Sequence, residues 1–528
     1  MREYATDPGT AAGLQLDEGN QLALQKLYAV RPTWTAVVTA ASALDLAPHC
    51  LLHAGPPFAD PSRPSAPILA SAALCCVYEG WADDLSSARK LILDGRVTLR
   101  PAQDYDVVTP LAAVISPSTS LVEVADLNTG TRCWSLLPSG AGPQIRFGTF
   151  DLAIIERLRW RDQVLAAALQ GWLADRSIEL IPLAQAGLRV GDDLHAQTTG
   201  ATAALLQLMR EGQAPQKVID VLEAAPLFFL TLWMAACHLM LKATINSGAP
   251  SLVIGLAGNG QEVGIRLSGS PDRWLTRAAR TPNGPRMIDA PARAAPMLGD
   301  SGVIDAAGFG AQAWGHAQGL RELMAPWLPE GWAPDLGCML GQHPAFAEFA
   351  LGTGLDAGLA QQQACPPMVA LAMLDNEAGL GLLGRGVCVT DPALYALPGL
   401  GQPEINQPDV LATVNRAVDH YERALTGNDL AELDRLFWHS AHTLRYGASE
   451  HLYGYTAIEA FRRARADSGQ LARHIVERSV TTFGDSFAVA NIVFQRSGNA
   501  KLGRQTQSWV RVEGEWRIVA AHVSWATT

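Results

Sequence analysis

Four prolines fall within residues 389–408 (VTDPALYALPGLGQPEINQP), and no other feature limits the folds open to this chain as strongly. Proline has a fixed φ and no backbone N–H, so this segment continues neither a helix nor a central strand. A chain of 528 residues also exceeds what one hydrophobic core usually organises. We therefore expect a large domain over residues 21–390, a Pro/Gly linker over 391–407 and a smaller domain over 408–528, with residues 1–20 as a flexible tail.

Charge also differs between the two parts. Residues 403–528 contain 14 acidic and 14 basic side chains, so the net charge of -11 belongs entirely to the first part. A negatively charged chain is a poor partner for nucleic acid, and we expect no nucleic-acid binding. Hydrophobic residues make up 48% of the chain and charged residues 17%, which indicates folded globular domains.

The sequence favours a cytoplasmic protein that does not enter membranes. The first twenty residues are polar and lack the basic start and apolar run of a signal peptide. The most apolar stretch, residues 225–241, is shorter than the ~20 residues of a membrane span and contains Pro226 and His238, so a buried core helix is expected. The eight cysteines are scattered, without a CxxC pair or zinc-like spacing. They predict reduced, mostly buried thiols and no metal site.

The pattern of the second part predicts an α+β domain. Helical spacing of apolar residues extends from about 408 to 426, a second short helix ends near Phe437, and Thr456 with Glu459 forms the capping box of a third. The pattern then alternates over 474–483, 487–496, 504–513 and 516–525, which predicts a four-strand antiparallel meander. Helices that close one face of such a curved sheet form a cone, whose interior is a pocket for a small molecule.

Two side chains of the second part are candidates for chemistry in this pocket. Tyr421 lies on the apolar face of the first helix, where a buried phenol needs a hydrogen-bond partner and either acts as a general acid or only packs. Arg445 lies in a short extended segment that faces the pocket, and an unpaired buried charge is costly. It is therefore either a clamp for a substrate carboxylate or the partner of an internal acid such as Glu450.

Several motifs of the second part occur together in one known family. They are HYERAL, LDRLFW, HTLRYGASEHLYGY, IEAFRRAR, VTTFG, GRQTQSWVR and WRIVAAHVS. With them, residues 405–525 resemble the AtzH/HpxZ family of SnoaL-like, nuclear-transport-factor-two-like proteins. The AtzH branch is described as hydrolysing 1,3-dicarboxyurea with a tyrosine on the first helix and an arginine on the following strand. The resemblance implies that Tyr421 and Arg445 are catalytic, and Tyr453, Tyr455 and Ser508 are further candidates for substrate binding.

The first part is rich in Gly and Ala, and its helical and extended runs predict one large α/β or α+β domain. Several short strings place glycine beside a polar side chain, which lets backbone N–H groups and arginine approach a small anion. None has the spacing of a P-loop or a dinucleotide fingerprint, so no cofactor is expected. The candidates for substrate binding are His53, Glu79, Arg146, Asp193, His195, Arg266 and Asp300.

The strings of the first part occur in the same order in a second family. They are LLHAGPP, YEGWA, IRFG, ERLRWRDQVL, GDDLHAQ, FFLTLWMAAC, GNGQEVGIRLSG, RTPNG and MLGDS. With them, residues 20–390 resemble the AllG (YlbE-type) subunit of oxamate carbamoyltransferase, which works with FdrA-type subunits to convert oxalurate and phosphate to oxamate and carbamoyl phosphate. Two segments depart from that family, since residues 109–113 replace a glycine-rich turn and residues 370–379 lack an expected histidine.

Together the resemblances imply a bifunctional protein of ureide and nitrogen catabolism. In this reading, a carbamoyltransferase-type domain is fused to a domain that hydrolyses or decarboxylates a carboxylated urea, either 1,3-dicarboxyurea or a relative of oxalurate. The expected ligand is a small anionic ureide or carbamoyl compound, and the expected partners are FdrA-type subunits and further copies of the chain. In the alternative reading, the chain is a non-catalytic subunit that needs FdrA-like partners. Its second part is then a binding or dimerisation module with Trp509, Trp516 and Trp525 at an interface.

Overall fold

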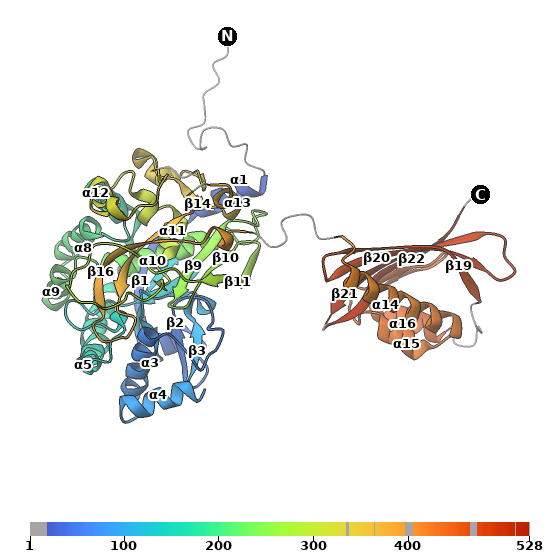
Figure 1. Cartoon of the computed structure of the whole chain (residues 1–528), viewed down its shortest axis with the longest axis horizontal. Coiled ribbons are helices and arrows are strands. Elements are labelled where there is room, and N and C mark those ends of the chain that lie inside the picture. Colours follow the sequence, from blue (N-terminus) through green and yellow to red (C-terminus); the bar gives the residue numbers. More distant parts are fainter. Residues whose placement is uncertain are drawn as a thin grey trace, which may run out of the picture. The chain divides into compact units, whose positions relative to one another are not determined.

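The computed structural model describes residues 18–333, 337–363, 365–396, 405–464, 472–512 and 514–526. The chain forms two compact units, residues 1–396 and 397–528, and both mix helices with open sheets (Figure 1). The mixed helix and sheet composition agrees with the predicted fold class.

The first unit is built on a five-stranded sheet with the strand order β4-β7-β6-β1-β8. β1 and β6 pair antiparallel, whereas β4 and β7 are parallel. Every residue of β6 is buried, as expected of a strand covered on both faces. Helix α10 packs against β6, β7 and β4, and α6 packs against β1. The strands are β1 (Pro32–Thr39), β4 (Val107–Val108), β6 (Ser120–Asp126), β7 (Arg132–Leu136) and β8 (Ile178–Glu179), and the two helices are α6 (Ala166–Leu173) and α10 (Phe229–Lys242).

Two smaller sheets and two hairpins complete the strands of this unit. The sheets have the orders β11-β10-β9-β12 and β3-β2-β5, and the hairpins are β13-β14 and β15-β16. Helix α11 packs on β9, and α3 packs on β5. These strands are β2 (Cys50–His53), β3 (Thr98–Pro101), β5 (Val114–Ile115), β9 (Val253–Asn259), β10 (Glu262–Leu267), β11 (Ser270–Ala278), β12 (Leu298–Gly299), β13 (Met339–Gly341), β14 (Thr353–Leu355), β15 (Met368–Leu374) and β16 (Leu382–Val389).

The sequence of the first unit predicts helical runs at about 20–30, 66–76, 84–94, 151–174, 196–212, 216–242, 311–327 and 356–364, and a helix forms in each of them. The helices Ala40–Ala43, Ile181–Arg189 and Gly302–Ala307 were not predicted. The single helix expected over 216–242 is divided, and the run expected over 311–327 contains short 3₁₀ turns around α12. The remaining helices are α1 (Glu18–Ala29), α2 (Ala40–Ala43), α3 (Ala66–Tyr78), α4 (Leu85–Leu93), α5 (Ala153–Trp160), α7 (Ile181–Arg189), α8 (Thr199–Glu211), α9 (Gln216–Ala224), α11 (Gly302–Ala307), α12 (Gln318–Met324) and α13 (Ala357–Gln362).

The most apolar segment of the chain forms the core helix α10. All of its residues from Phe229 to Leu241 are buried, which confirms the prediction of a core helix there. Among the described residues, no single helix has the length and apolarity of a membrane span. The pair α9 and α10 passes such a test only when both helices are taken together, and they bend by 85°. The break between the two helices contains Pro226, whose ring prevents α9 and α10 from forming one continuous helix.

The second unit places three helices on a six-stranded sheet with the order β18-β17-β22-β21-β20-β19. The four predicted strands occur as its antiparallel meander, and β17 adds to β22 in parallel. The predicted capping box is wrong, because the third helix begins one residue before Thr456 and its N-cap is Gly454. The elements are α14 (Pro408–Gly427), α15 (Leu430–Leu436), α16 (Tyr455–Arg463), β17 (Leu444–Tyr446), β18 (His451–Tyr453), β19 (Arg473–Phe483), β20 (Phe487–Arg496), β21 (Leu502–Val512) and β22 (Glu515–Trp525).

The core of the second unit contains two of the three tryptophans expected at an interface. Trp509 is fully buried and Trp516 is 7% exposed, and both belong to the apolar core that also contains Val414 and Val418 of α14. Trp525 is only half-buried and lies against Phe494. Trp509 and Trp516 are therefore explained by the core of one copy of the chain.

A buried ion pair connects helices of the first unit to its five-stranded sheet. Arg161, at the start of a π-helical turn between α5 and α6, donates two hydrogen bonds of 2.7 and 2.8 Å to Asp162. The same carboxylate accepts hydrogen bonds from the hydroxyl of Tyr78 on α3 and from the N–H of Ser120 on β6. Both charged side chains are at most 6% exposed. One carboxylate thus connects two helices and a strand.

We expect Asp162→Asn to lower the free energy of unfolding by about 3–5 kcal/mol, because the variant leaves the Arg161 charge buried and unpaired. Urea unfolding followed by circular dichroism measures this loss. The matched control is Asp175→Asn, which breaks the exposed pair with Arg176 and should leave the transition nearly unchanged. Equal stability of the wild type and Asp162→Asn would contradict the expectation.

Candidate functional site

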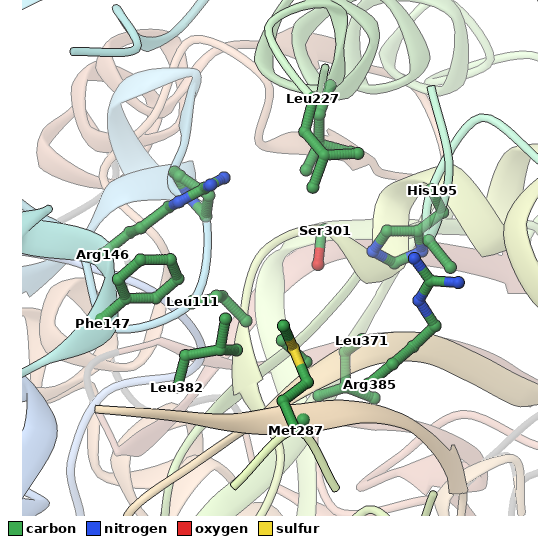
Figure 2. Close-up of a pocket in the computed structure, with 15 residues that line it drawn as sticks. Leu111, Arg146, Phe147, His195, Leu227, Met287, Ser301, Leu371, Leu382 and Arg385 are labelled. Carbon is green, nitrogen blue, oxygen red and sulfur yellow. The ribbon is translucent and has the colours of Figure 1, made fainter. Parts of the chain in front are cut away.

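The first unit contains a mostly apolar cavity of about 230 Å³ where segments from most of its length meet (Figure 2). Leu227 at the bend before α10 and residues of the β15-β16 hairpin form much of its apolar wall. Two predicted site residues, Arg146 and His195, line the same cavity although 49 positions separate them. The complete lining is Pro110, Leu111, Arg146, Phe147, His195, Ala196, Leu227, Leu230, Met287, Ser301, Leu371, Ala372, Leu382, Gly384 and Arg385.

Two arginines give this cavity a positive charge. Arg146, in a 3₁₀ turn, and Arg385, on β16, lie on opposite sides of it in Figure 2. No carboxylate among the described residues pairs with either guanidinium, and the Nε atom of Arg146 is buried without a hydrogen-bond partner. Burial lowers the pKa of Arg146 to about 10. An unpaired guanidinium in apolar surroundings is costly, and a bound anion would relieve that cost.

A histidine–aspartate pair lies in the wall of the same cavity. His195 Nδ1 is 2.7 Å from an oxygen of Asp305 on α11, and both side chains are at most 3% exposed. The second oxygen of Asp305 accepts the N–H groups of Ala311 (2.8 Å) and Ala370 (3.2 Å). Burial raises the pKa of Asp305, which the neighbouring imidazole partly offsets. An oriented imidazole beside a carboxylate is suited to move a proton through its other nitrogen.

Glycine is required beside this pair. Gly310 has a φ of +60°, and a Cβ atom at this position would lie 2.4 Å from Asp305 Oδ1 and 3.0 Å from His195 Nδ1. Its N–H also donates to the carbonyl of Asp193. The chain therefore passes close to the pair only because residue 310 has no side chain.

Two further predicted residues support the cavity from behind. Asp193 accepts the N–H groups of His195 (3.0 Å) and Gln197 (2.8 Å) and the indole N–H of Trp314 (2.8 Å), which folds the turn that carries His195. Asp193 therefore has a positioning role.

Asp300 holds the opposite wall together. It accepts hydrogen bonds from the N–H of Gly55, the side-chain amide of Gln103, and both the N–H and the hydroxyl of Thr109. Pro110, which follows Thr109, and Ser301, which follows Asp300, line the cavity. Burial raises the pKa of Asp300 to about 6 against the effect of these donors.

The structure does not bring the other three candidates of the first unit to this cavity. His53 is fully buried, its Nδ1 lies 2.8 Å from the carbonyl of Ala54, and burial lowers its pKa to about 4. Glu79 caps α3 and accepts two hydrogen bonds from Ser118. Arg266 lines a second cavity, where it faces Asp104 and donates to the carbonyl of Gln103.

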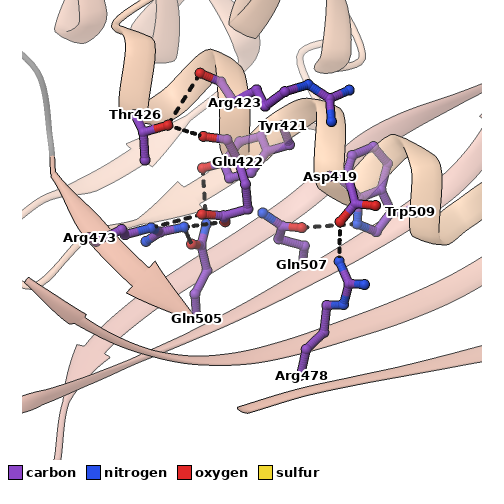
Figure 3. A network of polar contacts seen from close by, with 10 residues as sticks. All are labelled: Asp419, Tyr421, Glu422, Arg423, Thr426, Arg473, Arg478, Gln505, Gln507 and Trp509. Atoms are coloured by element: carbon purple, nitrogen blue, oxygen red, sulfur yellow. Dashed lines mark hydrogen bonds and ion pairs between the residues drawn. The ribbon is translucent and has the colours of Figure 1, made fainter. Parts of the chain in front are cut away.

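The candidates of the second unit are distributed over different surroundings. Tyr421 is 4% exposed, and its hydroxyl accepts a hydrogen bond of 3.0 Å from Gln505 within a polar network (Figure 3). Arg445 pairs with Glu450 at 2.7 Å, so the internal acid that the sequence offered as an alternative is its partner here. Its guanidinium also lies over the ring of Phe461.

Two of the three remaining candidates, the tyrosines, have partners of their own. Tyr453 is 69% exposed, and its hydroxyl lies 3.1 Å from that of Tyr446. Tyr455 stacks on His439, and burial together with the charge of Asp434 raises its pKa to about 12. Ser508 alternates with the buried Gln507 and Trp509, so it lies on the opposite face of β21.

Sequence reasoning missed Arg385 and Asp305, although both stand out once the fold is known. Arg385 is the single charged residue of the apolar strand β16, between two glycines, and Asp305 is the single charged residue of the buried helix α11. A charge inside an apolar, fully buried element signals a bound partner. The two segments that depart from the AllG family also reach this cavity, through Leu111 and Leu371.

The raised pKa of Asp300 predicts how stability changes with pH. Between about pH 4 and pH 6 the folded chain holds a proton that the unfolded chain has released, so this group's contribution to the free energy of unfolding declines as the pH rises through that window and is constant above it. A shift of about two pKa units corresponds to roughly 3 kcal/mol. Urea titrations of the wild type and Asp300→Asn at several pH values measure the difference, and parallel pH profiles would contradict the expectation.

The comparisons with known proteins agree with the division into two units. Residues 97–301 match the family model described as oxamate carbamoyltransferase subunit AllG, and residues 403–528 match the model described as AtzH-like. The oxamate carbamoyltransferase subunit AllG of Escherichia coli (strain K12) is 28% identical over 392 residues, which cover 70% of this chain and 93% of that protein. The uncharacterized protein YahG of the same organism is 26% identical, with coverage of 70% and 82%.

A solved structure shares the fold of the first unit. A conserved protein of unknown function from Enterococcus faecalis V583 superposes with a TM-score of 0.66 at 23% identity, over 72% of this chain and 95% of that chain. Both predicted resemblances are thus confirmed. This chain joins, in one polypeptide, a region that resembles the AllG subunit of oxamate carbamoyltransferase and a region that resembles the AtzH-like family.

Proposed function

We propose that the first unit is a carbamoyltransferase-type subunit that binds a small carboxylated ureide or carbamoyl compound in the cavity between Arg146 and Arg385. The observation that carries this proposal is the pair of guanidinium groups that have no carboxylate partner among the described residues. Two planar, permanently charged groups in one small cavity fit a ligand with two anionic ends, or a carboxylate together with phosphate.

In this proposal, His195 moves the proton that carbamoyl transfer requires. When a phosphate oxygen attacks the carbamoyl carbon of a ureide, the C–N bond breaks and the departing nitrogen takes up a proton. The imidazole donates that proton, and Asp305, 2.7 Å away, stabilises its protonated form. Among the described residues, no group bonds to the second ring nitrogen of His195, whose side chain lines the cavity.

The proposal includes partner chains and a changed substrate preference. A subunit of this family works with other subunits, so we infer FdrA-type partners and further copies of this chain. Leu111 and Leu371 belong to the two segments that depart from the family, and both face the cavity. We therefore infer that these two leucines change which ureide the cavity accepts.

A second candidate function belongs to the second unit, hydrolysis of a carboxylated urea with Tyr421 as proton donor. Tyr421 is buried, its hydroxyl accepts a hydrogen bond from Gln505, and no described side chain accepts its proton. The amide of Gln507 nearby is also buried without an acceptor. Arg445 would bind a substrate carboxylate only in exchange for Glu450. The competing proposal is that this unit is a non-catalytic binding or dimerisation module.

For the first unit, we expect Arg146→Met and Arg385→Met each to weaken the binding of oxalate, a small probe with two carboxylates, by roughly 10–100-fold, since a hydrogen bond to a charged group contributes about 1.5–3 kcal/mol. Isothermal titration calorimetry of the full chain with oxalate measures this change. The control is Arg96→Met, which removes an exposed arginine. Unchanged affinity in both cavity variants would refute the anion site.

For the second unit, we expect the full chain to convert 1,3-dicarboxyurea to carbon dioxide and a monocarboxylated urea, and Tyr421→Phe to slow this reaction by roughly 10²–10⁴-fold, the usual contribution of a general acid. Arg445→Ala should raise KM, while the exposed Arg511→Ala serves as the matched control. If the folded wild type releases neither product, the non-catalytic alternative holds.

A further inference from the structure

A second polar cluster of the first unit lies apart from the cavity of Arg146 and takes no part in the proposed reaction. Asp106 comes directly before β4, and its carbonyl accepts the N–H of Trp134, so the parallel pairing of β4 with β7 places it beside Cys133. Helix α10 covers these strands and adds His238. One ligand atom from each of Asp106, Cys133 and His238 lies within 4.8 Å of the other two.

His238 is the unusual member of this cluster. Its residue exposure is 4%, both ring nitrogens are buried, and neither makes a hydrogen bond of good geometry. Buried polar groups normally have partners. An imidazole whose nitrogens both lack a partner, beside a thiol and a carboxylate, has a nitrogen available to a metal ion.

A cation already lies at the carboxylate of this cluster. The ammonium of Lys242, one helical turn after His238, is 2.6 Å from Asp106 Oδ2, while His238 Nε2 is 4.0 Å from Oδ1. The Lys242 side chain is 30% exposed, so it can move into solvent. The cluster borders a cavity of about 250 Å³ that Asp106, His238 and Lys242 help to line. This cavity gives an ion access to Asp106 and His238, two of the three ligands.

We propose that Asp106, Cys133 and His238 bind a divalent transition-metal ion of the zinc class. Thiolate sulfur, imidazole nitrogen and carboxylate oxygen are the ligand types that zinc takes, and three protein ligands leave a fourth position open toward the cavity. Ligand atoms around zinc are about 3.5 Å apart, which these side chains reach by small rotations. Binding releases the proton of the Cys133 thiol and displaces the ammonium of Lys242 from Asp106.

The test is a titration of the full chain with Co²⁺, whose bond to a thiolate gives an absorption band in the near ultraviolet. We expect one equivalent to bind with this band, and Zn²⁺ to displace it. Cys133→Ser should abolish the band, whereas the matched control Cys388→Ser, which alters another buried thiol, should retain it. His238→Gln should weaken binding by roughly 100-fold or more.

Lys242→Met makes the test specific to this geometry. Because the variant removes the ammonium that competes for Asp106, we expect it to tighten Co²⁺ binding by about tenfold, which corresponds to about 1.4 kcal/mol. A merely structural cluster predicts no such gain. Circular dichroism verifies that each variant is folded. If the wild type binds no Co²⁺, or if the band persists in Cys133→Ser, the proposed site is refuted.

Discussion

A carboxylate that is buried away from water needs hydrogen-bond donors from the protein, and the loops around the cavity of the first unit are held by carboxylates of this kind. Asp300 takes four donors from Gly55, Gln103 and Thr109, all of which lie more than 190 positions before it in the sequence. Asp305 and Asp193 organise the turns on the other side in the same way. Loops that make few regular hydrogen bonds of their own are thus held at fixed positions, and the side chains between them line a defined space.

The first unit is negatively charged as a whole, but its cavity is positively charged. The unit carries the whole negative charge of the chain, whereas its cavity contains two guanidinium groups and no described carboxylate that pairs with them. Repulsion at long range is screened within about 8 Å at physiological ionic strength, but attraction inside an apolar cavity is screened much less. Such a distribution favours small anions that fit between the arginines over large polyanions that remain at the surface.

In the second unit, the alternation of apolar and polar residues along the sequence predicts much of the fold. β20 and β21 bury every second residue over most of their length, and the limits of all four long strands were predicted from the alternating sequence pattern to within about two residues. The short strands β17 and β18 have too few residues to establish a period, but both lie within the short extended segments expected at 442–447 and 451–455. The division of α9 from α10 was missed because apolar residues continue through the bend, where only Pro226 indicates the break.

The candidate site was predictable where a polar residue adjoins glycine in a loop, and not where it interrupts an apolar element. Arg146 and His195 belong to the first kind, and both line the cavity. Arg385 and Asp305 belong to the second kind, and their relation to His195 depends on tertiary contacts that join residues more than 100 positions apart. Arg445 shows a further limit, since sequence alone does not decide between an internal acid and a substrate carboxylate.

The positions of the cysteines give this chain a built-in chemical reporter. All eight thiols are buried, and all eight belong to the first unit. A thiol reagent in solution therefore reacts only when that unit opens, and it does not react with the second unit, which has no cysteine. The rate of thiol modification therefore measures how often the first unit opens, within the intact chain and without any engineered label.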